Sequence, residues 1–289
     1  MERVVSVEEV RTALARPRLE GRTVGFIPTM GALHAGHLEL VRSSLRHADV
    51  TVVSIFVNPT QFGPGEDYDA YPRDPEGDAA LLAAEGVQVL FEPTVAVMYP
   101  DGAETSVDPG PLGDVLCGAS RPGHFRGVAT VVAKLFNIVE PDLAFFGEKD
   151  YQQLQVIKRI VRDLDMRVRI VGVPTVREGD GLAMSTRNRY LTPEERTHAT
   201  ILHRALATAY DAACSGESDA AAIERALTQA IEREPMIELE YAAVVDAETL
   251  APIETLERPG RALVAARVGR ARLIDNVAIL PAGACADSE

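Results

Sequence analysis

Five short apolar runs organise the first 175 residues of this chain, and a helical pattern separates each run from the next. The runs are rich in valine, isoleucine and phenylalanine, as in parallel strands that are buried on both faces of a sheet. They occupy residues 23–27, 50–57, 87–91, 143–146 and 168–173. Repeated alternation of strand and helix predicts an α/β fold, a Rossmann-like doubly wound parallel sheet.

The pattern changes after residue 175. Thr192, Pro193 and Glu195 form a strong helix start, and a second helical pattern runs from about Ser218 to Pro235. Three strand-like runs follow, at residues 239–245, 262–268 and 273–280. We therefore expect two domains: residues 1–175 with the parallel sheet, and residues 176–289 as a smaller C-terminal α+β domain.

The stretch from Val24 to His37 is the first candidate site. We expect Pro28 to end the first strand, and Leu38 to open a helical repeat. His34 and His37 then stand near a helix N-terminus, where exposed N–H groups and the helix dipole favour a phosphate. An isolated HxGH motif is weak evidence, because a short motif of this kind more often marks two merely solvated histidines.

Other polar groups also follow predicted strands. Gln61 lies on the loop after the second strand, where open α/β sheets bind ligands, although an exposed loop amide is an equal alternative. Lys149, Asp150 and Gln153 occupy the corner after the fourth strand, and a loop rich in hydroxyl groups leads to Arg187. Neither GxGxxG nor a Walker P-loop is present, which disfavours the usual dinucleotide and kinase sites.

Composition narrows the class of protein. A net charge of −14 argues against nucleic acid or anionic lipid as a partner. No run is long enough to span a bilayer, and the acidic N-terminus lacks the pattern of a secretory signal. Cys117, Cys214 and Cys285 are widely spaced, so we expect unpaired thiols in a reducing compartment and a cytoplasmic protein.

Several motifs together resemble those of the bacterial pantothenate synthetase family, and the similarity covers nearly the whole chain. They are PTMGALHAGH at residues 28–37, SIFVNPTQF at 54–62, YPRD at 71–74, SRPGHFRGV at 120–128, FFGEKDYQQL at 145–154, GVPTVRE at 172–178 and GLAMSTRNRYL at 181–191. The HxGH motif alone would indicate only the nucleotidyltransferase superfamily. Thr60 and Thr186 replace the Met and Ser that we expect in close relatives.

The resemblance implies a cytoplasmic homodimer that condenses pantoate with beta-alanine, using ATP and Mg²⁺, through a pantoyl-adenylate. It implies His37, His34 and Lys149 as catalytic residues and Gln61 and Gln153 as pantoate ligands. It assigns to ATP the following residues: Met30, Gly31, His34, Gly36, His37, Gly147, Glu148, Lys149, Asp150, Val176, Met184, Ser185, Thr186 and Arg187. Asp78 is a weak candidate for a metal contact.

Two other classes of protein stay open at this point. A different HxGH nucleotidyltransferase would release pyrophosphate but no AMP. A regulator that only binds ATP would show no turnover, although it would have no use for so many charged motif residues.

Overall fold

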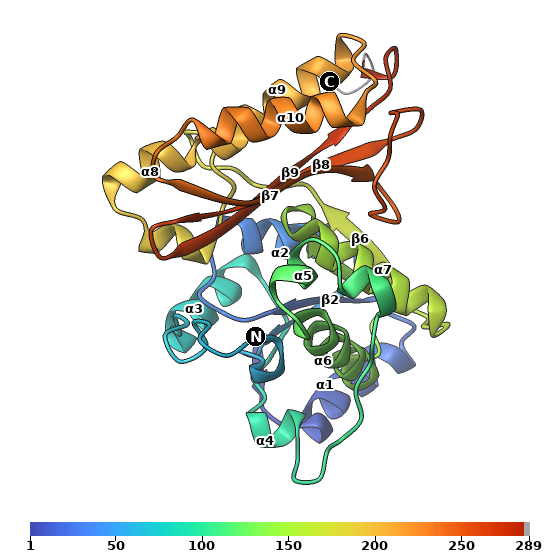
Figure 1. Cartoon of the computed structure of the whole chain (residues 1–289). Helices are drawn as coiled ribbons and strands as arrows, with labels where there is room; N and C mark the ends of the chain where they lie inside the picture. Colours follow the sequence, from blue (N-terminus) through green and yellow to red (C-terminus); the bar gives the residue numbers. More distant parts are fainter. Residues whose placement is uncertain (286–289) are drawn as a thin grey trace. The chain divides into compact units, whose positions relative to one another are not determined.

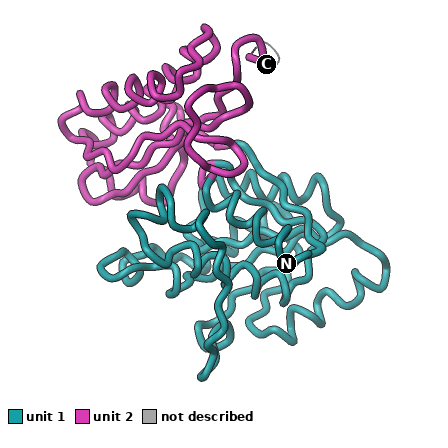
Figure 2. The backbone as a smooth tube through the Cα atoms, turned by 45° about the vertical axis from the view of Figure 1, so that its right-hand side comes forward, with its two compact units in different colours: residues 1–148, 152–174 teal, residues 149–151, 175–289 magenta. Residues whose placement is uncertain are grey.

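The computed structural model describes residues 1–285, which divide into two compact units (Figure 2). The first unit comprises residues 1–148 and 152–174, and the second comprises residues 149–151 and the described residues from 175 onward. The short segment 149–151 thus groups with the C-terminal half, whereas the sequence had placed it in the first domain. Within residues 1–285, no helix combines the length and apolar character needed to cross a membrane.

The first unit is built on a six-stranded parallel sheet with the order β1-β4-β3-β2-β5-β6 (Figure 1). Its strands are β1 (Glu2–Val4), β2 (Val24–Thr29), β3 (Val50–Ile55), β4 (Val89–Phe91), β5 (Leu143–Gly147) and β6 (Arg169–Val173). The doubly wound α/β prediction is confirmed. The sequence missed β1, because three residues are too few to show a strand period.

Helices pack on both faces of this sheet. They are α1 (Val7–Leu19), α2 (Ala35–His47), α3 (Pro75–Glu85), α4 (Val95–Met98), α5 (Cys117–Ser120), α6 (His124–Val139) and α7 (Tyr151–Asp163), with single turns η1 (Pro59–Gln61), η2 (Gly110–Gly113) and η3 (Glu148–Asp150). Ile27 and Val53 belong to an apolar cluster with Leu40 of α2 and Leu82 of α3. On the other face, the Phe136 ring of α6 meets the ring of Phe26, 6.4 Å away between centroids.

The expectation that Pro28 ends the first strand is wrong. Pro28 lies inside β2, in register with Ser54 of β3. The carbonyl of Val24 accepts from the backbone N–H of Asp142. The backbone N–H and C=O groups of the even-numbered residues of β2 therefore point toward β5, and those of the odd-numbered residues point toward β3. Pairing with β5 ends at Phe26, so no bond to β5 is lost at Pro28.

The second unit packs helices against an antiparallel sheet of three strands. Its elements are η4 (Thr186–Tyr190), α8 (Pro193–Ala199), α9 (Ile201–Cys214), α10 (Ala220–Glu232), β7 (Ile237–Asp246), β8 (Gly260–Val268) and β9 (Ala271–Ile279). This confirms the predicted α+β class. Figure 1 shows α9 and α10 along one face of the sheet, and their apolar residues share a buried cluster with Ala262, Val264 and Leu273.

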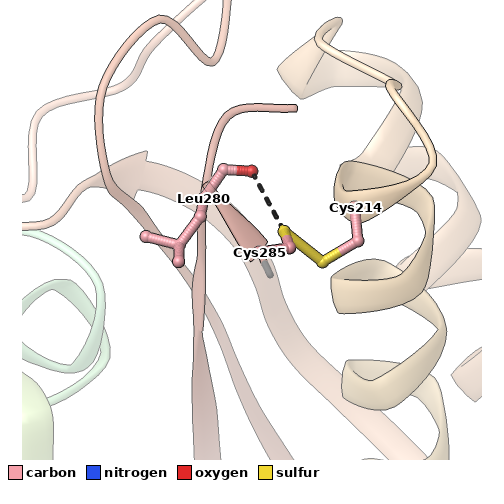
Figure 3. Close-up of a disulfide and its surroundings, with 3 residues drawn as sticks. All are labelled: Cys214, Leu280 and Cys285. Atoms are coloured by element: carbon pink, nitrogen blue, oxygen red, sulfur yellow. Dashed lines mark hydrogen bonds between the residues drawn. A yellow bond between two sulfur atoms is a disulfide. The ribbon is translucent and has the colours of Figure 1, made fainter. Parts of the chain in front are cut away.

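A disulfide joins Cys214, the last residue of α9, to Cys285, with 5.6 Å between the Cα atoms (Figure 3). The prediction of three unpaired thiols is therefore wrong for this pair. Cys117 is outside the disulfide and buried. The two partners stand 71 residues apart in the sequence, so no local pattern reveals the pairing.

We expect reduction of this disulfide to lower the free energy of unfolding of the oxidised protein by about 2–4 kcal/mol, because the unfolded chain regains loop entropy. Urea denaturation with and without dithiothreitol measures the change. The variant Cys214→Ser should match the reduced protein and should not respond to dithiothreitol. Equal stability of the oxidised and reduced proteins would contradict the expectation.

Candidate active site

The HxGH motif forms the N-terminal cap of α2. His34 is the capping residue, and its Nδ1 accepts from the backbone N–H of Gly36 at 3.2 Å. The Nδ1 of His37 accepts in turn from the backbone N–H of His34 at 3.3 Å. The two rings lie 4.1 Å apart between centroids. The predicted position of both histidines at a helix N-terminus is confirmed.

These bonds determine which nitrogen of each ring carries the proton. A backbone N–H can bond to Nδ1 only when Nδ1 is unprotonated, so the proton of each neutral imidazole is on Nε2. Both Nε2–H groups are then donors, and they stand at the positive end of a helix of 13 residues. This arrangement suits an anionic ligand such as a phosphate.

Asp78 of α3 supports the turn that precedes the histidines. Its two carboxylate oxygens accept from the backbone N–H groups of Ala32 at 2.8 Å and Leu33 at 2.7 Å. The turn needs this support because Gly31 and Ala32 both have positive φ, at 81° and 51°. Asp78 is only 3% exposed. Its role as a metal contact stays a prediction, whereas its contacts describe a structural anchor.

Gln61 and Met30 lie together in the first unit, after β3 and β2. Gln61 Nε2 lies 3.2 Å from Met30 Sδ, and Gln61 Oε1 accepts from Asn58 Nδ2 at 3.0 Å. Asn58 is itself 1% exposed and is held by bonds to Tyr99 Oη and the Gly127 carbonyl. The amide of Gln61 is therefore oriented by a buried network. In the sequence, Asn58 appeared only as one member of the motif at residues 54–62.

Arg121, which follows α5, and His124, the first residue of α6, also contact Gln61. His124 Nδ1 lies 2.7 Å from the Gln61 carbonyl oxygen, and Arg121 donates to the same oxygen at 3.3 Å. Arg121 also pairs with Glu66 at 2.6 Å. Burial raises the pKa of Glu66, but the Arg121 guanidinium outweighs it and holds the pKa below its ordinary value. No sequence pattern indicated Glu66.

The corner after β5 is divided between the two units. Lys149 and Asp150 lie in η3, with Lys149 Nζ 3.7 Å from Asp150 Oδ1. Gly147 and Glu148 precede them in the first unit, which also contains the half-buried Gln153 of α7.

The segment from Val176 to Arg187 forms a hydrogen-bonded turn. Met184 N–H donates to the Val176 carbonyl at 2.9 Å, and Arg177 and Ala183 form an antiparallel bridge. Ser185 caps η4, where its hydroxyl accepts from the Arg187 N–H at 3.3 Å. The loop rich in hydroxyl groups is thus held by hydrogen bonds at both ends of the turn.

Charged pairs hold this turn. Arg177 makes two bonds to Asp275, at 2.6 and 3.1 Å, and donates to the Gly181 carbonyl at 3.1 Å. Arg196 pairs with Glu178 and Asp180. Its hydrogen bond is the main reason that the pKa of Glu178 lies below the ordinary value.

Proteins of a known family match this chain over nearly its whole length. The sequence model of the family described as pantoate-beta-alanine ligase matches residues 2–278. A pantothenate synthetase of Moorella thermoacetica is 53% identical over 281 residues, which cover 96% of this chain and 99% of that protein.

Two solved structures are also similar. The pantothenate synthetase of Thermus thermophilus is 52% identical, with a TM-score of 0.92, and the match covers 97% of this chain and 100% of that one. The pantoate-beta-alanine ligase of Francisella tularensis, complexed with beta-gamma ATP and beta-alanine, is 33% identical, with a TM-score of 0.78, over 96% of this chain and 97% of that one.

We expect Asp78→Ala to lower the free energy of unfolding by about 2–4 kcal/mol, because two buried N–H groups lose their acceptor. Asp78→Asn should cost less, since the amide keeps one acceptor oxygen. Urea denaturation measures both. Glu76→Ala, on the exposed side of the same helix, should change the value by no more than about 0.5 kcal/mol. An Asp78→Ala protein as stable as the Glu76→Ala control would contradict the anchoring role.

His203 gives a pH-dependent expectation. Burial first, and then the Arg177 guanidinium, lower its pKa below the ordinary 6.5, although Asp275 opposes them. The unfolded chain therefore binds a proton at higher pH than the folded chain, and stability falls as the pH drops below about 6.5. Urea denaturation between pH 7.5 and 5.5 should show this loss, and His203→Asn should show less of it. An unchanged pH dependence in the variant would refute the assignment.

Proposed function

The chain belongs to the pantoate-beta-alanine ligase family, and from this membership we propose that it condenses pantoate with beta-alanine to form pantothenate at the expense of ATP. In the first step the pantoate carboxylate attacks the α-phosphorus, and the bond to the bridging oxygen breaks to release pyrophosphate. In the second step the amine of beta-alanine attacks the acyl carbon of the pantoyl-adenylate, and AMP leaves. The product would supply coenzyme A biosynthesis.

One observation carries the chemical part of the proposal: the two Nε2–H donors of His34 and His37 at the N-terminus of α2. Negative charge develops on the phosphate oxygens during attack and departure, and donors already in place stabilise it without reorganisation. The complex of the Francisella relative with beta-gamma ATP and beta-alanine supports the choice of substrates.

The remaining roles are assigned by motif. We place Lys149 on the α-phosphate and the leaving group, and His37 as the proton donor. Gln61 and Gln153 would bond to pantoate, with Met30 against its methyl groups. The following residues would hold the nucleotide: Gly31, Gly36, Gly147, Glu148, Asp150, Val176, Met184, Ser185, Thr186 and Arg187. The phosphate-binding loop belongs to residues 176–289, which we propose close over the bound substrates.

Mg²⁺ is the expected companion of ATP. Within residues 1–285, no group of three or more His, Cys, Asp or Glu side chains could hold a metal ion. We propose an ion held mainly by the phosphate oxygens of ATP and by water, because these are the ligands that Mg²⁺ prefers. The bound ion would neutralise phosphate charge, while the histidines and Lys149 orient the phosphates.

Location and assembly follow from the family alone. We propose a cytoplasmic homodimer, whose size light scattering of the purified protein would test. In a reducing cytoplasm we expect the Cys214–Cys285 pair to be in the thiol form, which rapid alkylation of cell lysates would reveal.

The adenylate predicts an isotope exchange. With pantoate, ATP and Mg²⁺ but no beta-alanine, labelled pyrophosphate should enter ATP, and omission of pantoate should abolish the exchange. The complete mixture should form AMP and pantothenate in equal amounts. AMP formation without any pantoate-dependent exchange would contradict the intermediate, and pyrophosphate release without AMP would indicate another nucleotidyltransferase.

The phosphate assignment predicts the effect of single substitutions. Lys149→Ala and His37→Ala should each lower kcat by about 100-fold or more, because each removes a preorganised donor. Steady-state AMP formation measures this. Lys158→Ala removes an exposed lysine of α7 and should leave the rate unchanged. Near-normal rates in the first two variants would overturn the assignment.

A further inference from the structure

The segment Lys149–Tyr151 groups with the C-terminal unit, although β5 before it and most of α7 after it belong to the first unit. Some contact in the second unit must therefore hold it. We propose that Arg261 and Asn276, two buried residues of the C-terminal sheet, are positioning residues that set the place of Lys149. This inference rests on the proposed function, which assigns Lys149 to the phosphates of ATP.

Asn276 holds the backbone of Lys149 directly. Its Nδ2 donates to the Lys149 carbonyl oxygen at 2.9 Å, and its Oδ1 accepts from Arg261 Nε at 2.6 Å. Asn276 is 3% exposed. A buried amide that uses both ends cannot rotate without leaving a donor facing a donor. The amide of Asn276 therefore keeps one orientation, and the sheet that carries it determines where the Lys149 carbonyl lies.

Arg261 holds the other end of the segment. Its guanidinium lies 4.0 Å from the centroid of the Tyr151 ring, and the Tyr151 hydroxyl donates to the Ala247 carbonyl at 2.9 Å. Arg261 is only 8% exposed, so this stacking takes place away from water, where a cation–π contact is strongest. The segment 149–151 is thus fixed at two points, the Lys149 carbonyl and the Tyr151 ring.

The sheet provides a separate face for this contact. Ala262 and Val264 of β8 belong to the cluster under α9 and α10, so the alternating Arg261 and Leu263 face the other way. Asn276 pairs in register with Leu263 and therefore lies on the same face as Arg261. Arg272, four residues earlier on β9, instead pairs within the sheet with Glu240. The two positioning residues are thus distinguished by their contact with the segment 149–151.

The test compares variants of the full chain in the complete reaction. Asn276→Asp keeps an acceptor for Arg261 but loses the donor to Lys149. We expect kcat/KM for ATP to fall by about 10-fold to 100-fold, because a small displacement of a catalytic group is costly. KM for pantoate should stay within about twofold of the parent. Arg261→Lys, which keeps the charge but not the planar fork, should give a smaller change in the same direction.

Arg272→Ala is the matched control on the same strand. It removes an ion pair of the same sheet, so it should lower the melting temperature without altering the response to ATP. If Asn276→Asp and Arg261→Lys behave like this control, with a lower melting temperature and normal ATP kinetics, the positioning role is refuted. If Asn276→Asp fails to fold by circular dichroism, the comparison of Arg261→Lys with Arg272→Ala decides alone.

A double substitution separates this inference from the proposed function. In a Lys149→Ala background, adding Asn276→Asp should change the residual rate by less than about twofold, because the group that it positions is gone. If the double variant instead loses rate by the product of the two single-variant losses, the inference is overturned. If Lys149→Ala alone keeps a near-normal rate, the phosphate assignment itself is wrong. If Lys149→Ala is impaired but Asn276→Asp is not, only the positioning role is wrong.

Discussion

Two adjacent side chains of β9 hold both segments of the C-terminal unit to which phosphate contacts are assigned. Asp275 binds Arg177, which in turn donates to the Gly181 carbonyl, and Asn276 binds the carbonyl of Lys149. Neighbouring residues of a strand point to opposite faces, so one strand can reach both segments at once. The spacing of Lys149 from the turn before Ser185 therefore depends on the rigidity of a sheet rather than on either loop.

Buried polar side chains also hold the turns of the first unit. A buried carboxylate, Asp78, holds the turn before His34, and a buried amide, Asn58, orients Gln61. In both units several of the groups assigned to substrate, such as Gln61 and Lys149, lie in single turns, which have little rigidity of their own. Buried polar groups supply it, since a low-dielectric interior makes a satisfied hydrogen bond strong and a broken one costly.

The sequence predicted those features that local patterns encode. The β-branched runs indicated the parallel strands, and the capping box at Thr192 begins α8 as expected. Partners far apart along the chain left no such signal: Leu33 is 45 residues from the Asp78 that holds it, and Cys285 is 71 from Cys214. The prediction that Pro28 ends the first strand failed for a related reason. A strand can contain proline only where the missing N–H has no partner, and here that depends on where the distant strand β5 stops pairing with β2.

The disulfide also changes what a single break in the backbone would do. The 71-residue separation of Cys214 and Cys285 places α10 and all three strands of the C-terminal sheet between the two sulfurs. A protease that cuts once within residues 215–284 of the oxidised protein therefore produces two fragments that remain covalently joined. Such a nicked chain would migrate as one species on a denaturing gel until a reductant separates its pieces.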